Sequence, residues 1–246
     1  MHAVGIVPAR FAARRFPGKP LALIAGKPML QHVVEGARRA KRLREVIVAT
    51  DDARIAQACA RFGARAVMTS AAHATGTDRS AEAAAGLEAE IVVNVQGDEP
   101  LIEGFVIDAV VDALIAAPDC AMATAVHRAD ADAAQDPNRV KVVLDRAGNA
   151  LYFSRAAIPH PAAASRAAPV WQHVGLYAYR RAFLLEYVRL PQTAAELAEQ
   201  LEQLRALEHG FKIRCAMIEG WRSVPVDVPE DIARVEAALA LRGARA

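Results

Sequence analysis

The chain has little cysteine, few aromatic residues and almost no net charge. Its 246 residues include three cysteines, 5% are aromatic, and the formal net charge is +2. Cys59, Cys120 and Cys215 lie far apart, so the sequence predicts neither a disulfide framework nor a CxxC zinc site. The charge balance argues against general nucleic-acid binding, which is typical of proteins with an excess of lysine and arginine, and no basic stripe is interleaved with aromatic residues, so this role is a distant third alternative.

Long hydrophobic runs are also missing. No apolar run reaches the roughly 18 residues that a membrane-spanning helix needs. The first apolar run begins at Val4, which leaves no room for a signal peptide. We therefore expect a cytoplasmic protein with no membrane partner. The length and the 54% hydrophobic content suit one large domain over residues 1–246.

Several well-known nucleotide and catalytic motifs are absent. Gly18-Lys19 suggests a phosphate-binding P-loop, but residues 11–16 hold no glycine and Pro20 replaces the hydroxyl residue. No GxGxxG follows a predicted strand, which argues against a dinucleotide-binding oxidoreductase. GxSxG and HExxH are absent as well, so the sequence predicts neither a serine hydrolase nor a zinc protease.

Buried strands alternate with helices in the first half of the chain. Apolar runs at Val4–Val7, Glu45–Thr50 and Ile91–Val95 are separated by helical segments. This order is typical of an α/β fold with a mostly parallel central sheet and helices on both faces. Such sheets bind ligands at the carboxyl ends of their strands. We expect the loop after Val7, the loop of residues 73–79 and Asp98 to lie along that edge.

In the second half of the chain, short or alternating apolar runs predict inserted antiparallel or mixed strands. They lie at Ala121–Val126, Val140–Leu144, Leu151–Phe153 and Gln172–Tyr179. Residues 159–169 are predicted to be a loop. Residues 193–209 are predicted to form one helix whose buried stripe holds four leucines: Leu197, Leu201, Leu204 and Leu207.

A loop rich in cations follows the first strand. It carries Arg10, Arg14, Arg15 and Lys19 without an acidic residue, and such side chains can converge on a polyanion. Asp98 follows a predicted strand; it either closes a turn before Pro100 or binds a metal ion. Asp227 is either a helix cap or a second metal ligand. A basic loop with isolated carboxylates suits magnesium-assisted nucleotidyl transfer, because Mg²⁺ takes one or two carboxylates together with phosphate oxygens.

Eight segments in register also resemble one family, the 3-deoxy-manno-octulosonate cytidylyltransferases. They are PARFAARRFPGKPL (8–21), HATGTDR (73–79), VQGDEP (95–100), DPNRVKVVLD (136–145), ALYFSRAAIP (150–159), HVGLYAYR (173–180), LEQLR (201–205) and VDVPEDI (226–232). The chain departs from the usual pattern at Ala13, Arg14 and Thr75.

The resemblance implies an enzyme that joins CTP to 3-deoxy-D-manno-octulosonate (Kdo), giving CMP-Kdo and pyrophosphate for lipopolysaccharide biosynthesis. It also implies Mg²⁺ as cofactor, a nucleotidyltransferase-like fold, and a homodimer with dimerisation elements among the inserted strands at about 121–210. The implied catalytic residues are Arg10, Lys19, Asp98 and Asp227, with both aspartates as metal ligands. The implied nucleotide-binding residues are Ala9, Arg10, Arg15, Lys19, His73, Thr75, Gly76, Arg79 and Asp98.

The resemblance places the sugar acid at six residues: Gln96, Arg155, His173, Tyr177, Glu202 and Gln203. Pattern alone favours other interpretations for some of them. His173 and Tyr177 suit a packed core, while Glu202 and Gln203 suit the solvated side of a helix. Arg155 suits either a surface ion pair or a side chain that steers the substrate carboxylate.

Two alternative functions stay open. A cytidylyltransferase for another sugar acid, of the sialic-acid type or an amino-substituted Kdo, would use the same chemistry. A nucleotide-binding regulatory module that has lost its activity would keep the fold, although the retained carboxylates and basic loop argue against it.

Overall fold

The computed structural model describes residues 2–12, 16–160 and 169–243. The chain divides into two compact units, residues 1–108 with 223–246 and residues 109–222. Helix α4 (Gly104–Ile115) contains the first boundary between them. The expectation of one domain with inserted strands at about 121–210 stays a prediction. The loop predicted at 159–169 lies mostly outside the described residues.

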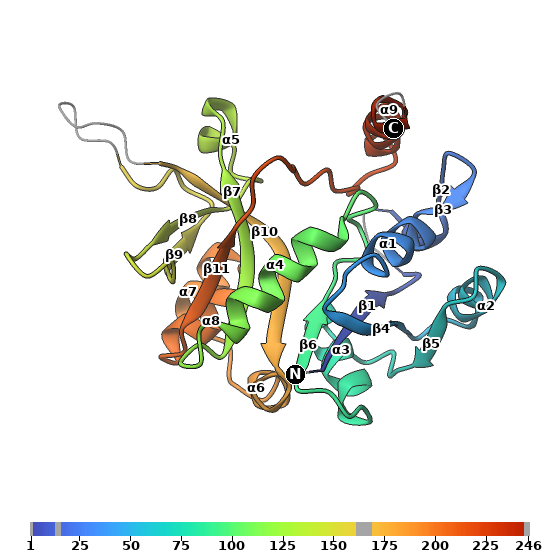
Figure 1. Cartoon of the computed structure of the whole chain (residues 1–246), viewed down its shortest axis with the longest axis horizontal. Helices are drawn as coiled ribbons and strands as arrows, with labels where there is room; N and C mark the ends of the chain where they lie inside the picture. The colour runs from blue at the N-terminus through green and yellow to red at the C-terminus, as the bar shows by residue number, and fades with distance from the viewer. Residues whose placement is uncertain (1, 13–15, 161–168, 244–246) are drawn as a thin grey trace. The chain divides into compact units, whose positions relative to one another are not determined.

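The first unit contains a parallel sheet (Figure 1). Its strands, in spatial order, are β6 (Ile91–Asn94), β1 (Ala3–Ala9), β4 (Leu43–Thr50) and β5 (Arg65–Met68). Ile6 lies opposite Ile47 on one side and Asn94 on the other. Ile6, Val7 and Ile47 are fully buried. Strands covered on both faces need continuous apolar runs, which is why the sequence predicted them well.

The helices of the first unit begin and end at local signals. They are α1 (Met29–Ala37), α2 (Ala53–Arg61), α3 (Gly76–Ala85) and α9 (Asp231–Gly243), with the 3-10 turn η1 (Lys19–Leu21) and the hairpin β2 (Leu23–Ile24) and β3 (Lys27–Pro28). Asp52 caps α2 by accepting from the Arg54 amide. Helix α3 starts at Gly76, inside the loop predicted at residues 73–79, because Thr75 and Asp78 form a capping box.

A small apolar cluster joins the end of the chain to the first unit. It contains Ile24, Met29, Leu101, Val226 and Val235, all buried. The Val226 amide also donates to the Asp98 carbonyl at 2.9 Å. These contacts place Asp227, which is far from Asp98 in the sequence, next to the carboxyl end of β6.

The second unit contains a mixed sheet. Its strands are β7 (Met122–Arg128), β8 (Lys141–Leu144), β9 (Ala150–Ser154), β10 (Trp171–Arg180) and β11 (Ile213–Met217). β10 pairs antiparallel with β7 and β8, β8 pairs antiparallel with β9, and β11 lies parallel to β7. The predicted class, α/β with a mostly parallel sheet and added strands, is confirmed. The sequence did not predict the short helices α5 (Ala131–Gln135) and α6 (Arg181–Tyr187).

The single helix predicted over 193–209 is wrong. Two helices lie there, α7 (Ala194–Glu199) and α8 (Gln203–Glu208). They are separated at Gln200, whose φ of 54° is left-handed and ends α7. Leu201 and Leu204 are buried as predicted, but Leu197 is 52% exposed.

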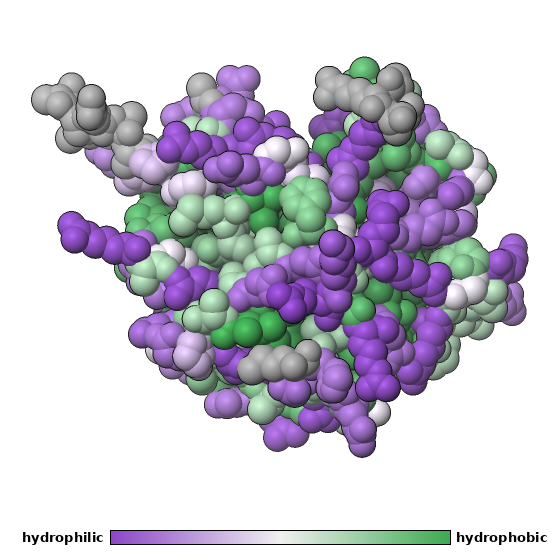
Figure 2. Space-filling model, viewed as in Figure 1, coloured by the Kyte–Doolittle hydropathy of each residue, from purple (hydrophilic) through white to green (hydrophobic). Residues whose placement is uncertain are grey.

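Hydrophilic residues cover much of the face seen in Figure 2, with apolar patches between them. Such a mixture is ordinary for a protein surface. Within the described ranges, every helix is too short or too polar to cross a membrane.

Candidate active site

The first unit holds a cavity of about 540 Å³ at the carboxyl ends of β1 and β6. This volume suits a small-molecule ligand. Eight of the nine predicted nucleotide-binding residues line it: Ala9, Arg10, Lys19, His73, Thr75, Gly76, Arg79 and Asp98. Gln96 and Asp227 line it as well. The ninth, Arg15, lies outside the described residues, as do Ala13 and Arg14.

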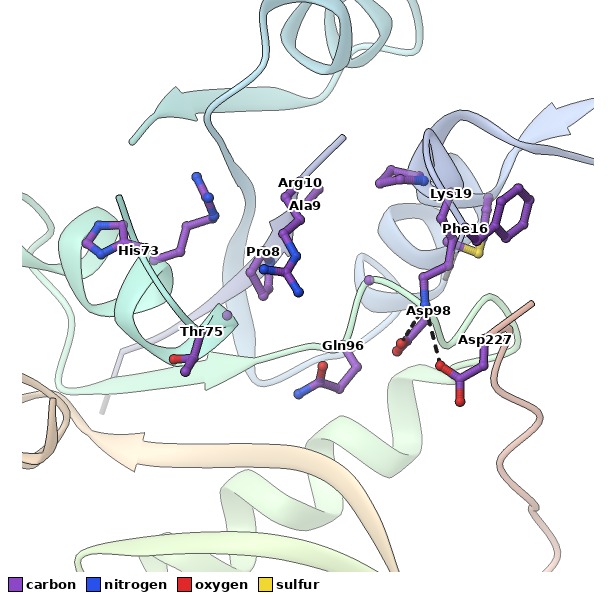
Figure 3. A pocket seen from close by; sticks show the side chains of 15 residues that line it. Pro8, Ala9, Arg10, Phe16, Lys19, His73, Thr75, Gln96, Asp98 and Asp227 are labelled. Atoms are coloured by element: carbon purple, nitrogen blue, oxygen red, sulfur yellow. Dashed lines mark hydrogen bonds and ion pairs between the residues drawn. The ribbon is translucent and has the colours of Figure 1, made fainter. Parts of the chain in front are cut away.

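The Lys19 ammonium lies between the two predicted metal ligands (Figure 3). Its Nζ donates to Asp98 Oδ2 at 2.9 Å and to the Val226 carbonyl at 2.8 Å, and it lies 3.8 Å from Asp227 Oδ1. Asp98 and Asp227 therefore face one point of positive charge. A cation is stable there because two carboxylates and a carbonyl surround it.

Glu99, next to Asp98, was not predicted as part of the site. Its carboxyl is buried and accepts from the Ser223 hydroxyl, while its Oε2 has no hydrogen-bond partner within the described part of the chain. Burial, with smaller contributions from the negative charges of Asp98 and Asp227, raises the pKa of Glu99 to about 8. The protonated, neutral form of Glu99 is therefore favoured at pH 7.

Close backbone packing brings β1 and the loop after β6 together. A Cβ atom on Gly97 would lie 2.8 Å from the Pro8 carbonyl oxygen, so only glycine fits. The next residue of the same loop is Asp98, and two residues after Pro8 stands Arg10, which is exposed. In Figure 3 the Arg10 side chain lies between His73 and Thr75 on one side and Lys19 and Asp98 on the other.

The N-terminus of α3 forms another wall of the cavity. Thr75 and Gly76 line the pocket there, and the positive end of the helix dipole favours an anion. The Thr75 hydroxyl is engaged with Asp78 in the capping box. Glu82 accepts from the Ser70 amide and interacts with the His73 ring.

Arg79 lines the pocket, but its guanidinium is already occupied by protein groups. It is 3% exposed; Nη1 donates to the Thr69 hydroxyl at 2.5 Å and Nη2 lies 3.1 Å from Asp51 Oδ2. Asp51 follows the carboxyl end of β4. Asp51 pairs with Arg79, while the next residue, Asp52, caps α2.

The other predicted sugar-binding residues lie in the second unit. His173, on β10, is flanked by the rings of Phe153 and Tyr177 at centroid distances of 5.1 and 5.4 Å. Loss of hydration lowers the pKa of His173 far below 6.5, so its ring is neutral.

Thr124 fixes the tautomer of His173. The Thr124 hydroxyl donates its proton to the carbonyl of Val174 or Leu176, at 3.0 and 2.8 Å. Towards His173 Nε2, 3.0 Å away, it therefore accepts, and Nε2 carries the ring proton. Nδ1 is left with its lone pair, which can accept a hydrogen bond from a hydroxyl group.

Tyr177 lies next to His173, and Glu202 at the start of α8 lies near Tyr177. Burial raises the pKa of Tyr177, and the nearby Tyr187 and Glu202 raise it further, so its hydroxyl keeps its proton. Glu202 precedes α8, and its carbonyl accepts from the Tyr187 hydroxyl. Gln203 is 4% exposed, and its Nε2 has no partner among the described residues.

Arg155 is held by main-chain oxygens. Its guanidinium donates to the carbonyls of Glu199 at 2.8 Å, Pro137 at 3.2 Å and Gln200 at 3.4 Å. The fully buried Lys141, which the sequence did not single out, donates to the Arg155 carbonyl at 2.5 Å. Arg155 thus stabilises the junction of α7 and α8 by binding the carbonyls that end α7.

The parallel sheet and its charged pocket define a nucleotidyltransferase, and a family model described as cytidylyltransferase matches residues 4–213. The 3-deoxy-manno-octulosonate cytidylyltransferase of Solibacter usitatus is 53% identical over 233 residues, covering 94% of this chain and 92% of that protein. The enzyme of the same name from Geobacter sulfurreducens is 51% identical and covers 96% and 98%.

A solved structure of CMP:2-keto-3-deoxy-manno-octonic acid synthetase complexed with CTP superposes with a TM-score of 0.93. It is 43% identical and covers 98% of this chain and all of that one. The chain therefore belongs to the 3-deoxy-manno-octulosonate cytidylyltransferase family, and the predicted membership is confirmed.

Proposed function

We propose that the chain transfers the cytidylyl group of CTP to Kdo, giving CMP-Kdo and pyrophosphate. One observation carries this proposal: a single cavity combines cationic Arg10 and Lys19 with the carboxylates Asp98 and Asp227. The related structure that binds CTP supports the choice of nucleotide, and the names of the relatives support the choice of sugar acid.

The reaction needs positioning and charge neutralisation more than covalent help from the protein. The sugar hydroxyl attacks the α-phosphorus in line, and pyrophosphate leaves. Arg10, Lys19 and the N-terminus of α3 stabilise the negative charge that grows on pyrophosphate. In the second unit, His173 Nδ1 accepts from a sugar hydroxyl, and the buried Gln203 amide donates to a sugar oxygen. Charged and neutral groups thus divide between the two substrates.

Asp98 and Asp227 fit a magnesium ion. The Lys19 ammonium already occupies a position between them, which shows that both carboxylates face a place for positive charge. No group of three or more His, Cys, Asp or Glu side chains within residues 2–12, 16–160 and 169–243 could hold a metal ion. Two carboxylates suit Mg²⁺, which completes its shell with phosphate and water. Mg²⁺ bound there would lower the pKa of the attacking hydroxyl and neutralise phosphate charge.

The direct test is pyrophosphate release from CTP. The protein is incubated with Mg²⁺, CTP and a panel of 2-keto sugar acids, and product masses are measured. We expect release with Kdo and loss of activity after EDTA treatment. No release with any sugar acid would contradict the enzyme function, whereas release with another sugar acid only would correct the substrate.

We also propose a homodimer and a cytoplasmic location. Among the described residues of the second unit, four large hydrophobic side chains are exposed: Leu151 at 60%, Met217 at 55%, Leu197 at 52% and Tyr152 at 39%. Exposed apolar groups support an interface with a second copy. The need for CTP supports the cytoplasm, and the product would serve lipopolysaccharide synthesis. Sedimentation equilibrium tests the dimer, because a monomer mass at micromolar concentration would contradict it.

A further inference from the structure

The structure assigns Arg54 as a positioning residue for the loop that carries Arg10 and Lys19. This inference rests on the proposed nucleotide function and adds a residue that lies outside the cavity lining. Arg54 is in the first turn of α2, just beyond the carboxyl end of β4. Its guanidinium carbon lies 3.4 Å from the centre of the Phe11 ring, a short cation–π contact.

Phe11 is the residue through which Arg54 acts. Phe11 directly follows Arg10, and its carbonyl accepts from the Gly18 amide at 2.8 Å. Its ring also covers Gly18, where an added Cβ would lie 3.3 Å from the ring and the φ of 74° favours glycine. Lys19 comes next in the chain. Phe11 therefore closes the loop at the two points from which Arg10 and Lys19 extend.

Asp52 holds Arg54 in the orientation that this contact needs. Arg54 Nε donates to Asp52 Oδ1 at 2.9 Å, and Nη2 donates to Oδ2 at 2.6 Å. Asp52 is itself fixed, because Oδ1 also accepts from the Arg54 amide as the cap of α2. A bidentate pair orients the guanidinium plane as well as its charge. The chain of contacts thus runs from the end of β4 through Arg54 and Phe11 to the phosphate-binding side chains.

The test uses two readouts on Arg54→Ala, Phe11→Leu and the double variant. The first readout is hydrogen exchange of the Gly18 amide by NMR in protein without nucleotide, which does not depend on any activity. The second is CTP affinity by calorimetry, together with KM for CTP and kcat. Arg61→Ala, an exposed arginine at the other end of α2, is the matched control.

We expect faster Gly18 exchange and CTP affinity lower by about 2- to 5-fold in each single variant. The double variant should be no worse than Phe11→Leu alone, because that change already removes the Arg54 contact together with the ring that covers Gly18. Phe11→Tyr, which keeps the ring, should behave as wild type, and kcat should change little. Unchanged Gly18 exchange in Arg54→Ala would overturn the inference, whatever happens to CTP.

A second outcome would also overturn it. If Arg54 touched the triphosphate itself, Arg54→Ala would weaken CTP binding while Phe11→Leu would not, and the effects would add. If wild-type protein failed to bind CTP while Gly18 exchange still responded, the positioning contact would stand and the proposed nucleotide function would fail.

Discussion

The residues assigned to substrate binding are mostly charged in the first unit and mostly neutral in the second. In the first unit, Lys19, Asp98 and Asp227 are charged, partly exposed and close together. In the second, His173 and Tyr177 are neutral groups among aromatic rings. A triphosphate is recognised by charge, whereas a sugar hydroxyl needs oriented neutral donors and acceptors. Substitutions in the first unit should therefore alter the affinity and KM for CTP. Substitutions in the second unit should alter the KM for the sugar acid.

The largest effect should come from Asp98→Asn. Loss of one carboxylate removes charge from the proposed metal site, so we expect turnover to fall about a thousandfold. CTP affinity should change far less, because Arg10 and Lys19 remain. Pyrophosphate release and calorimetry measure the two quantities. Asp132→Asn, at an exposed aspartate of α5, is the control, and near-normal turnover in Asp98→Asn would remove this carboxylate from the mechanism.

Lys19→Met should separate the two roles of the ammonium. We expect kcat/KM for CTP to fall about a hundredfold, because one donor to the triphosphate is lost. In protein without nucleotide, Mn²⁺ should bind more tightly, because the competing cation between Asp98 and Asp227 is gone. Electron paramagnetic resonance measures bound Mn²⁺. Lys27→Met, at a lysine paired with Glu35, is the control, and unchanged Mn²⁺ affinity would contradict this role.

Arg155→Ala tests the second unit. The variant loses three hydrogen bonds to main-chain carbonyls at the α7–α8 junction. We expect KM for the sugar acid to rise about tenfold while KM for CTP stays within about twofold. Steady-state kinetics with each substrate varied in turn gives both values. Arg146→Ala, the control, changes an exposed arginine between β8 and β9 and should have no effect. If Arg155→Ala raised the KM for CTP alone, the difference between the two units would be contradicted.

The smallest effect concerns pH. The pKa of His173 is lowered, so below pH 6.5 the unfolded chain binds more protons than the folded protein. The contribution of His173 to the free energy of unfolding is therefore fully present above pH 6.5. It falls as the pH drops, by at most about 1.4 kcal/mol per pH unit. Urea unfolding from pH 7.5 to 5 should show a weaker pH dependence in His173→Gln than in wild type. His209→Gln, at an exposed histidine, should not alter the slope.

Local patterns predicted much of the fold. Strands β1, β4 and β6 were predicted close to their observed bounds, because buried parallel strands need unbroken apolar runs. The break between α7 and α8 was not predicted. It depends on the left-handed Gln200 and on the buried ion pair of Glu196 with Arg205, at 2.5 Å. A left-handed residue other than glycine and an ion pair across nine residues leave no mark on the hydrophobic periodicity, so the pattern of leucines does not show them.

The candidate site was predictable to a different degree in each unit. Residues at strand ends, such as Asp98, share one edge of the sheet by topology, and the cavity gathers them as expected. The role of Arg79 was less visible, because only the structure shows its pairing with Asp51. Lys141 was missed for the same reason: a fully buried lysine looks like a surface residue until its carbonyl partners are known.

The sequence by itself determined the family, the α/β class and the residue types that would meet a nucleoside triphosphate, because these depend on local composition and order. The tertiary structure decided how those residues are used. It placed Asp227 beside Asp98 through packing of the last helix, and it put Lys19 between them. It also engaged Arg79 and Arg54 with the two aspartates that follow β4. Ion pairing and burial depend on distance in space, which the order of residues alone does not fix.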